Sequence, residues 1–317
     1  MASAQVFPER SVDVQLKFDG TTNRDRWVAG YLPMYSRAIN GATPKVWMYD
    51  KNGKKTIPET EILFPDTYYA NVWDVTADRS GNLYASMEIW SSAGAGTGAI
   101  CRVAPGAKKI LVVKTDDFRW VSLAAGNNGD IWAFGHPLLL QTVRRTKSEY
   151  DTLWHFDSSG RLIEKLLPRS VFGPDLIPTQ AFGDLGFPYL RITSARLGVY
   201  SATAGRWMEY DLSQRKWVVD VPIVRLRASD GIKPIMADLA MTEPDDSVYA
   251  FFVYRDVDAT HTSGLYRLDK RNAKWVHIDD GSKEFGGLFG ADGSDIILRA
   301  GSKTYGWFPE AKFAPMK

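Results

Sequence analysis

The chain has 317 residues, of which 44% are hydrophobic and 24% are charged, so it is long and apolar enough to bury a sizeable core. Its 39 Lys and Arg residues nearly balance 37 Asp and Glu residues, and a net charge of +2 gives no electrostatic reason to expect nucleic-acid binding. The single cysteine, Cys101, excludes an internal disulfide, and no apolar run approaches the roughly 18 residues of a membrane span.

The first residues predict export. Ala2-Ser3-Ala4 has the form of a signal-peptidase site, with Met1 read as a start residue placed before a mature chain. The lack of disulfides fits a bacterial periplasm. We therefore expect a periplasmic or secreted protein, and we expect it to be a monomer.

A short phrase of four residues recurs five times along the chain. Each copy alternates apolar and polar residues and leads into a turn, and the copies end at residues 50, 104, 157, 211 and 269. Short strands repeated at this spacing indicate radial repetition, which is typical of a β-propeller. The five copies are Trp47-Met48-Tyr49-Asp50, Cys101-Arg102-Val103-Ala104, Trp154-His155-Phe156-Asp157, Met208-Glu209-Tyr210-Asp211 and Tyr266-Arg267-Leu268-Asp269.

These phrases predict an all-β protein, a six-bladed propeller forming a single domain over residues 1–317. Each phrase is read as strand C, followed by a turn and strand D, and a second signature between the phrases is read as strand A, turn, strand B. The N-terminal segment 11–18, where Val12, Val14 and Leu16 alternate with polar residues, is predicted to complete the last blade and close the ring. The predicted blades are 27–64, 72–115, 119–167, 190–221, 236–279 and 285–308 plus 11–18.

The connections predict where function lies. The A–B and C–D turns share one face and are short, whereas several D–A and B–C connections on the other face are long. Long loops on a rigid scaffold usually carry binding or catalysis, so the sequence favours this loop face and the mouth of the central channel.

The loop face is rich in arginine. Arg26, Arg119 and Arg191 are predicted to stand where strand A begins, around the channel mouth, and aromatic residues such as Trp27 and Trp120 lie beside them. A guanidinium group matches carboxylate or phosphate geometry, so the predicted ligand is an anionic small molecule, a sugar acid or a glycan. The alternative is that these arginines pair with loop acids. The predicted ligand-binding residues are Arg26, Arg119, Arg191, Trp27, Trp120, Trp90, Tyr69 and Tyr189.

Four further residues are candidates for chemistry. Asp74 and Asp238 fall in the inner strands of opposite blades, where they are candidates to hold Ca²⁺ or Mg²⁺, the possible cofactor. His136 and His261 lie near or in loops, as a general base would. His155 and His277 fall in predicted outer strands and are read as structural. Familiar hydrolase, phosphate-loop and zinc motifs are absent from the sequence.

The segment Asp78-Arg79-Ser80-Gly81-Asn82-Leu83-Tyr84-Ala85, echoed at Asn127-Asn128-Gly129-Asp130-Ile131-Trp132-Ala133, resembles the strand-turn-strand core of NHL-repeat and gluconolactonase-like six-bladed propellers. The resemblance implies the architecture of most blades. In the gluconolactonase-like family a Glu, Asn and Asp set holds a divalent metal in the channel. Only Asp74 or Asp238 matches that set, so lactonase activity does not follow from the resemblance.

Three functional hypotheses remain open from the sequence. The leading one is a propeller that binds an anionic small molecule or sugar acid on its arginine-rich face. The second is a lyase or lactonase acting on a carbohydrate-type substrate with His136 or His261. The third is a protein-interaction scaffold.

Overall fold

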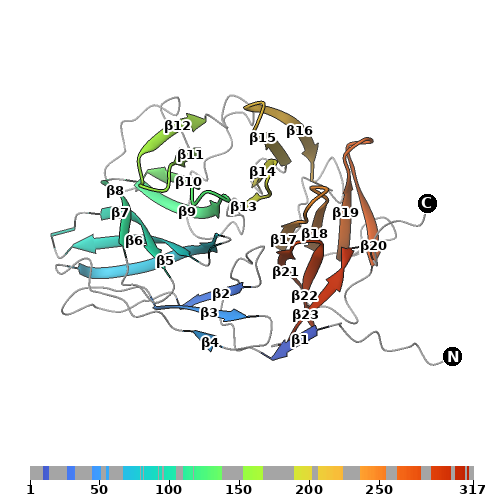
Figure 1. The fold of residues 1–317 in the computed structure, drawn as a ribbon, viewed down its shortest axis with the longest axis horizontal. Coiled ribbons are helices and arrows are strands. Elements are labelled where there is room, and N and C mark those ends of the chain that lie inside the picture. Colours follow the sequence, from blue (N-terminus) through green and yellow to red (C-terminus); the bar gives the residue numbers. More distant parts are fainter. Residues whose placement is uncertain are drawn as a thin grey trace.

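The computed structural model is built from β-strands grouped into sheets around a ring (Figure 1). No helix in the described part of the chain is long and apolar enough to cross a membrane. The structure describes residues 10–13, 27–32, 45–50, 55–56, 67–78, 80, 82–91, 93–94, 96–104, 110–116, 118–137, 153–166, 189–201, 206–223, 236–254, 263–279, 287–300, 304–310 and 313.

Blades 2 to 5 are four-stranded antiparallel sheets in which the strands follow one another in chain order. This is the A-to-D order that the repeat predicted, with each phrase as the third strand. Blade 2 holds β5 (Thr67–Ala77), β6 (Leu83–Ser91), β7 (Gly96–Val103) and β8 (Ile110–Asp116). Blade 3 holds β9 (Phe118–Ala125), β10 (Ile131–Pro137), β11 (Leu153–Phe156) and β12 (Leu162–Leu166). Blade 4 holds β13 (Tyr189–Ile192), β14 (Arg196–Ser201), β15 (Arg206–Asp211) and β16 (Lys216–Pro222). Blade 5 holds β17 (Met236–Met241), β18 (Val248–Val253), β19 (Gly264–Asp269) and β20 (Lys274–Asp279).

Blade 6 confirms the predicted closure of the ring. Its sheet runs β21 (Gly287–Asp292), β22 (Asp295–Ala300), β23 (Thr304–Pro309) and then β1 (Arg10–Asp13). The N-terminal strand pairs antiparallel with β23, with Val12 opposite Tyr305. The described strand covers 10–13, and residues 14–18 of the predicted segment lie outside the described residues.

Blade 1 corrects one strand assignment. It contains β2 (Trp27–Leu32), β3 (Lys45–Asp50) and β4 (Lys55–Thr56) within the described residues. The phrase strand β3 pairs directly with β2, with Trp27 opposite Asp50, just as β7 pairs with the second strand of blade 2. By its position in the repeat, β2 is therefore strand B, and Trp27 does not begin strand A as the sequence had suggested.

The aspartate that ends most phrases forms the turn after strand C. Asp157 accepts hydrogen bonds from the backbone N–H groups of Ser159 and Arg161, and Asp211 accepts them from Ser213 and Gln214. The Ser159 hydroxyl, followed by the Arg161 amide, lowers the pKa of Asp157, and the Gln214 amide and the Ser213 hydroxyl lower that of Asp211. Hence the repeat ends in Asp because this side chain replaces missing backbone partners in a tight turn.

A β-bulge interrupts the outer strand of each of blades 2 to 5, beside the first residue of the phrase in blades 2 and 5 and beside its third residue in blades 3 and 4. In blade 3, for example, Phe156 pairs with Leu162 and His155 with Glu164, which leaves Ile163 as the extra residue. A bulge disrupts the regular edge that would otherwise pair with another sheet. The extra residue is β-branched in every case: Val112, Ile163, Val218 and Ile278.

The core consists of separate apolar clusters, each lying where neighbouring blades meet. One cluster joins blades 4 and 5 around Trp207 and Phe252, which are both fully buried. Another joins blades 2 and 3 around Tyr84 and Trp120. Cys101 is also fully buried, as expected for a small core residue.

Candidate functional site

One polar side chain of each inner strand from β5 to β17 bonds to the backbone of the next inner strand. Two of the four side chains are the predicted metal ligands Asp74 and Asp238, and a third is the predicted ligand-binding Arg191. The four bonds are Leu123 N–H to Asp74 Oδ2 at 2.7 Å, Leu190 N–H to Ser122 Oγ at 3.0 Å, Arg191 Nε–H to the Leu239 carbonyl at 2.6 Å and Leu288 N–H to Asp238 Oδ2 at 3.3 Å.

These bonds give Asp74 and Asp238 a role in holding blades together. Asp74 also accepts hydrogen bonds from the Ser122 hydroxyl and the Val75 amide. Removal from water disfavours its charged form more than these donors favour it, and the pKa of Asp74 is raised to about 6. Within the residues that the structure describes, no three His, Cys, Asp or Glu side chains are grouped so as to hold a metal ion.

Arg119 and Trp90 meet at a buried carboxylate between blades 2 and 3. Glu88 accepts hydrogen bonds from the indole N–H groups of Trp73 at 2.8 Å and Trp90 at 2.7 Å, and Arg119 Nε lies 3.2 Å from it. The Arg119 guanidinium also stacks over the Trp73 ring, 4.7 Å from its centre. Its side chain is only 7% exposed, so Arg119 is committed to Glu88 and Trp73 rather than open to a ligand.

Trp120 does not offer a surface for ligand stacking. It is 0% exposed and packs edge-on against Trp154, with ring centres 4.9 Å apart. The sequence had placed it at the channel mouth because it starts an inner strand. The side chain instead fills the core between blades 2 and 3.

The remaining predicted site residues are only partly placed. The backbone of His136 lies in β10 opposite Arg119. Trp27, Tyr69 and Tyr189 lie in β2, β5 and β13. The side chains of these four, and Arg26 and His261 altogether, fall outside what the structure describes. Their proposed roles stay predictions.

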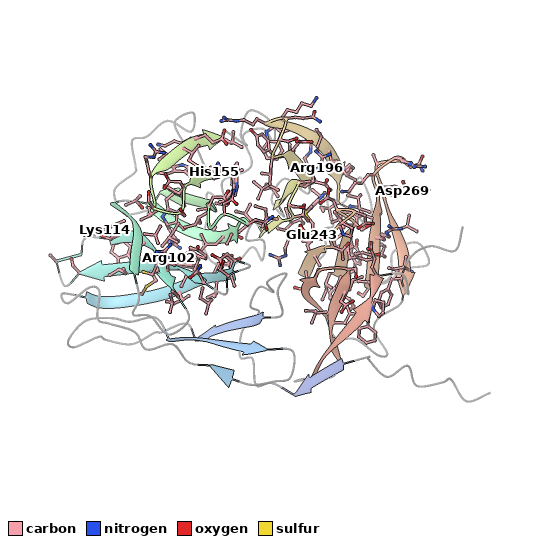
Figure 2. The ribbon with its side chains drawn as sticks, in the orientation of Figure 1. Arg102, Lys114, His155, Arg196, Glu243 and Asp269 are labelled. Atoms are coloured by element: carbon pink, nitrogen blue, oxygen red, sulfur yellow. The ribbon has the colours of Figure 1, made fainter. Side chains whose placement is uncertain are left out.

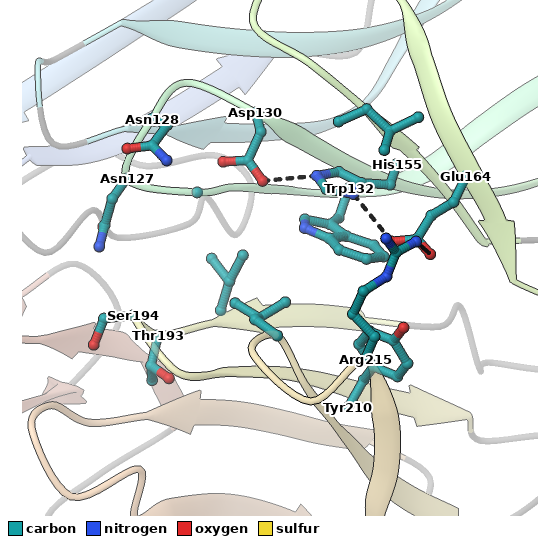
Figure 3. A pocket seen from close by; sticks show the side chains of 14 residues that line it. Asn127, Asn128, Asp130, Trp132, His155, Glu164, Thr193, Ser194, Tyr210 and Arg215 are labelled. Carbon is teal, nitrogen blue, oxygen red and sulfur yellow. Dashed lines mark hydrogen bonds and ion pairs between the residues drawn. The ribbon is translucent and has the colours of Figure 1, made fainter.

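A cleft of about 400 Å³ opens between blades 3 and 4 (Figure 3). Its walls include the A–B turns of both blades, 126–130 and 193–195, and the C–D turn 212–215 of blade 4. It therefore lies on the short-turn face, opposite to the face that the sequence favoured. Most of the long loops are outside the described residues, so the loop-face hypothesis stays a prediction.

A chain of charged groups runs along one side of the cleft. His155 Nε2 lies 2.8 Å from Asp130 Oδ2 and its Nδ1 lies 3.3 Å from Glu164 Oε1. Both ring nitrogens of His155 therefore face a carboxylate oxygen. The imidazole also stacks on Trp132, with ring centres 3.9 Å apart and planes at 10°.

Arg215 completes this chain from the neighbouring blade. Its Nη2 donates to Glu164 Oε2 at 2.6 Å, which bridges the C–D turn of blade 4 to the outer strand of blade 3. The Arg215 side chain is 62% exposed, so most of the guanidinium faces solvent. Desolvation and the charge of Glu164 raise the pKa of the neighbouring Tyr210, which therefore stays a neutral phenol at physiological pH.

The two ends of the cleft differ in chemistry (Figure 3). Arg215, His155 and Glu164 lie at one end. The amides of Asn127 and Asn128 and the hydroxyl side chains of Thr193 and Ser194 lie at the other. The aliphatic side chains that also line it are Ile163, Ile192 and Leu212.

His155, predicted to be structural, lines the cleft, and the sequence carries a signal for its contacts. The second residue of four phrases is Arg102, His155, Glu209 or Arg267. Each contacts a polar group outside its own strand: Arg102, for example, donates to the Ser158 carbonyl of blade 3, and Glu209 pairs with Lys270 of blade 5. Figure 2 labels Arg102 and His155 on neighbouring blades. Aligning the phrases position by position would have separated these residues from the apolar positions on either side.

Comparison with known proteins supports the architecture alone. No known protein family and no curated protein matches the sequence. Among solved structures, the chain is similar to the Swd1 β-propeller domain of Myceliophteria thermophila, at 12% identity and a TM-score of 0.46 over 96% of this chain and 99% of that one. A streptogramin B lyase is similar at 12% identity and a TM-score of 0.41, over 87% of this chain and 81% of that one.

A puromycin-hydrolyzing peptidase of Mycobacterium tuberculosis is also similar, at 13% identity and a TM-score of 0.44, over 84% of this chain but 41% of that one. These proteins differ in function, so the comparison carries no activity over to this chain. The order of the strands in its sheets makes the protein a β-propeller.

Proposed function

We propose that the protein is a recognition module that binds an anionic small molecule, such as a sugar acid, in the cleft between blades 3 and 4. The observation that carries this proposal is the distribution of groups in the cleft. An exposed guanidinium, Arg215, lies at one end, and the amide groups of Asn127 and Asn128 lie at the other.

This arrangement suits a ligand with an acid group at one end and hydroxyl groups at the other. Arginine binds a carboxylate with charge-assisted hydrogen bonds, and amides both donate to and accept from hydroxyl groups. Aliphatic contacts from Ile192 and Leu212 suit the apolar face of a sugar ring. A volume of about 400 Å³ lies within the range of small-molecule sites.

The first test is calorimetric titration with galacturonate and glucuronate, using galactose and glucose as uncharged controls. We expect saturable binding of an acid and not of its neutral counterpart. Arg215→Ala should weaken binding about tenfold, because a charge-assisted hydrogen bond contributes roughly 1.5–3 kcal/mol.

Arg161→Ala is the matched control. Arg161 lies on the same face, is 82% exposed and pairs with Asp157, but it does not line the cleft. Its loss should leave the affinity within about twofold, as expected for an exposed pair. Binding that survives Arg215→Ala but is lost in Arg26→Ala would move the site to the loop face, and turnover of the acid or its lactone would favour the lyase or lactonase hypothesis.

A further inference from the structure

We infer that Glu164 occupies the position in the cleft that the carboxylate of the ligand takes, so that this side chain competes with the ligand. The inference rests on the proposed function and names the residue that sets the affinity of the cleft for its ligand. The ligand class that follows is a monocarboxylate, and the specificity-determining residue is one that does not itself bind the ligand.

Glu164 is held between two side chains. Its two oxygens contact two different donors, His155 Nδ1 at 3.3 Å and Arg215 Nη2 at 2.6 Å. The Glu164 side chain is 15% exposed and lines the cleft. A histidine and an arginine therefore already form an anion-binding pair in this cleft, and a carboxylate of the protein fills it.

Both donors have other contacts that keep them in place. His155 is fixed by Asp130 at 2.8 Å and by stacking on Trp132. Arg215 also contacts Tyr210. If the Glu164 carboxylate leaves, a second carboxylate finds the same two donors close to their present positions.

Bonds to His155 and Arg215, rather than apolar packing, hold the Glu164 carboxylate. The residue lies in the outer strand β12, next to Leu162 and Ile163, which are 41% and 46% exposed. The ionisable groups that face one another here are Asp130, His155, Glu164, Arg215 and Tyr210. Removal of the Glu164 carboxylate leaves the Arg215 guanidinium without that carboxylate partner, and an incoming carboxylate replaces it.

The test uses acetate, the simplest carboxylate, as the probe. The resonance of the Arg215 Nε–H group is followed by NMR during titration of the native protein and of Glu164→Gln, with sodium chloride holding ionic strength constant. Glutamine keeps the shape of Glu164 but cannot compete as an anion. We expect the variant to bind acetate about tenfold more tightly, and Asp220→Asn, which removes a carboxylate paired with Arg206 on the outer strands, to behave as the native protein does.

Equal or weaker acetate binding in Glu164→Gln would overturn the inference, as would the absence of a shift at Arg215 in both proteins. The proposed function fails separately. If galacturonate binds and Arg215→Ala abolishes this binding while Glu164→Gln does not strengthen it, only the competition is wrong. If acetate binds more tightly to Glu164→Gln but no sugar acid binds either protein, the competition stands and the sugar-acid ligand is wrong.

Discussion

Where blade 2 meets blade 3, the short-turn face is closed; where blade 3 meets blade 4, it opens into a cleft. At the first boundary the Tyr84 hydroxyl contacts the Gly129 carbonyl at 3.4 Å, and Gly160 lies so close to Val112 that a Cβ would overlap the Val112 carbonyl oxygen. At the second boundary Ile163, the extra residue of the bulge in blade 3 as Val112 is in blade 2, is 46% exposed.

The difference comes down to one turn position. Blade 3 places Gly160 at the left-handed position of its C–D turn, with φ of 86°, and glycine lets the backbones touch. Blade 4 places Arg215 at the corresponding left-handed position, with φ of 52°, and its long side chain reaches back to Glu164. A recurring turn thus either closes a boundary between blades or supplies a cleft with a charged group, depending on the residue at its left-handed position.

Gly160→Ala should break the closed boundary and have the largest effect. The left-handed conformation costs an alanine about 1–2 kcal/mol, and the overlap with Val112 adds to it, so we expect a loss of about 3 kcal/mol in the free energy of unfolding. Gly94→Ala is the matched control, because Gly94 also has a positive φ (80°) but its Cβ would meet nothing within 4 Å. Urea unfolding of both variants measures the contact, and equal losses would contradict the packing argument.

Asp74→Asn tests how the ionisable side chain that bonds blade 2 to blade 3 makes stability depend on pH. The folded-state pKa of Asp74 is raised to about 6, whereas an unfolded aspartate titrates near about 3.9. Between these values the folded protein holds a proton that the unfolded chain has lost, so stability falls as pH rises from about 4 to 6. The variant should not show this fall, a difference on the order of 2 kcal/mol between unfolding curves at pH 4 and pH 7. Parallel pH profiles would show that Asp74 is ionised throughout.

Tyr84→Phe should weaken the closed boundary less. The Tyr84 hydroxyl donates to Asp78 Oδ2 at 3.0 Å in a buried setting, so its removal should cost about 1–2 kcal/mol. Asn82 also bonds to Asp78, which limits the loss. Thermal unfolding measures it, and a stability equal to that of the native protein would mean that the hydroxyl contributes nothing to the boundary.

Arg215→Gly should make the cleft boundary resemble the closed one and have the smallest effect on stability. Glycine removes the strain of a positive φ, while the loss of an exposed ion pair costs about 0–1 kcal/mol. We expect a change in the free energy of unfolding within about 1 kcal/mol, together with loss of anion binding. A large loss of stability would show that the Arg215–Glu164 pair is structural.

The blades could be predicted because their signal is local. Each phrase carries its own alternation, and most end in an aspartate that forms the following turn, so the repeat identifies the third strand of blades 2 to 5 without any knowledge of the ring. Closure by Val12 could be predicted as well, because Val12, Val14 and Leu16 alternate with polar residues as in a strand.

The site could not be predicted in the same way. Arg119 and Arg191 looked like ligand-binding residues, but their partners, Glu88 and the Leu239 carbonyl, lie on neighbouring blades. The cleft depends on contacts between blades, such as that of Arg215 in blade 4 with Glu164 in the outer strand of blade 3. Alternation within a strand carries no information on which residues of neighbouring blades meet.

The pairing of β1 with β23 also has a consequence for the order of folding. The strand that a ribosome makes first among those described here finds its partner last, nearly three hundred residues later, and such distant contacts form slowly because the long intervening chain must first be ordered. During synthesis the blades that follow are able to assemble in sequence while β1 waits. The ring therefore closes only after β23 has been made. Until then β1 has no sheet to join.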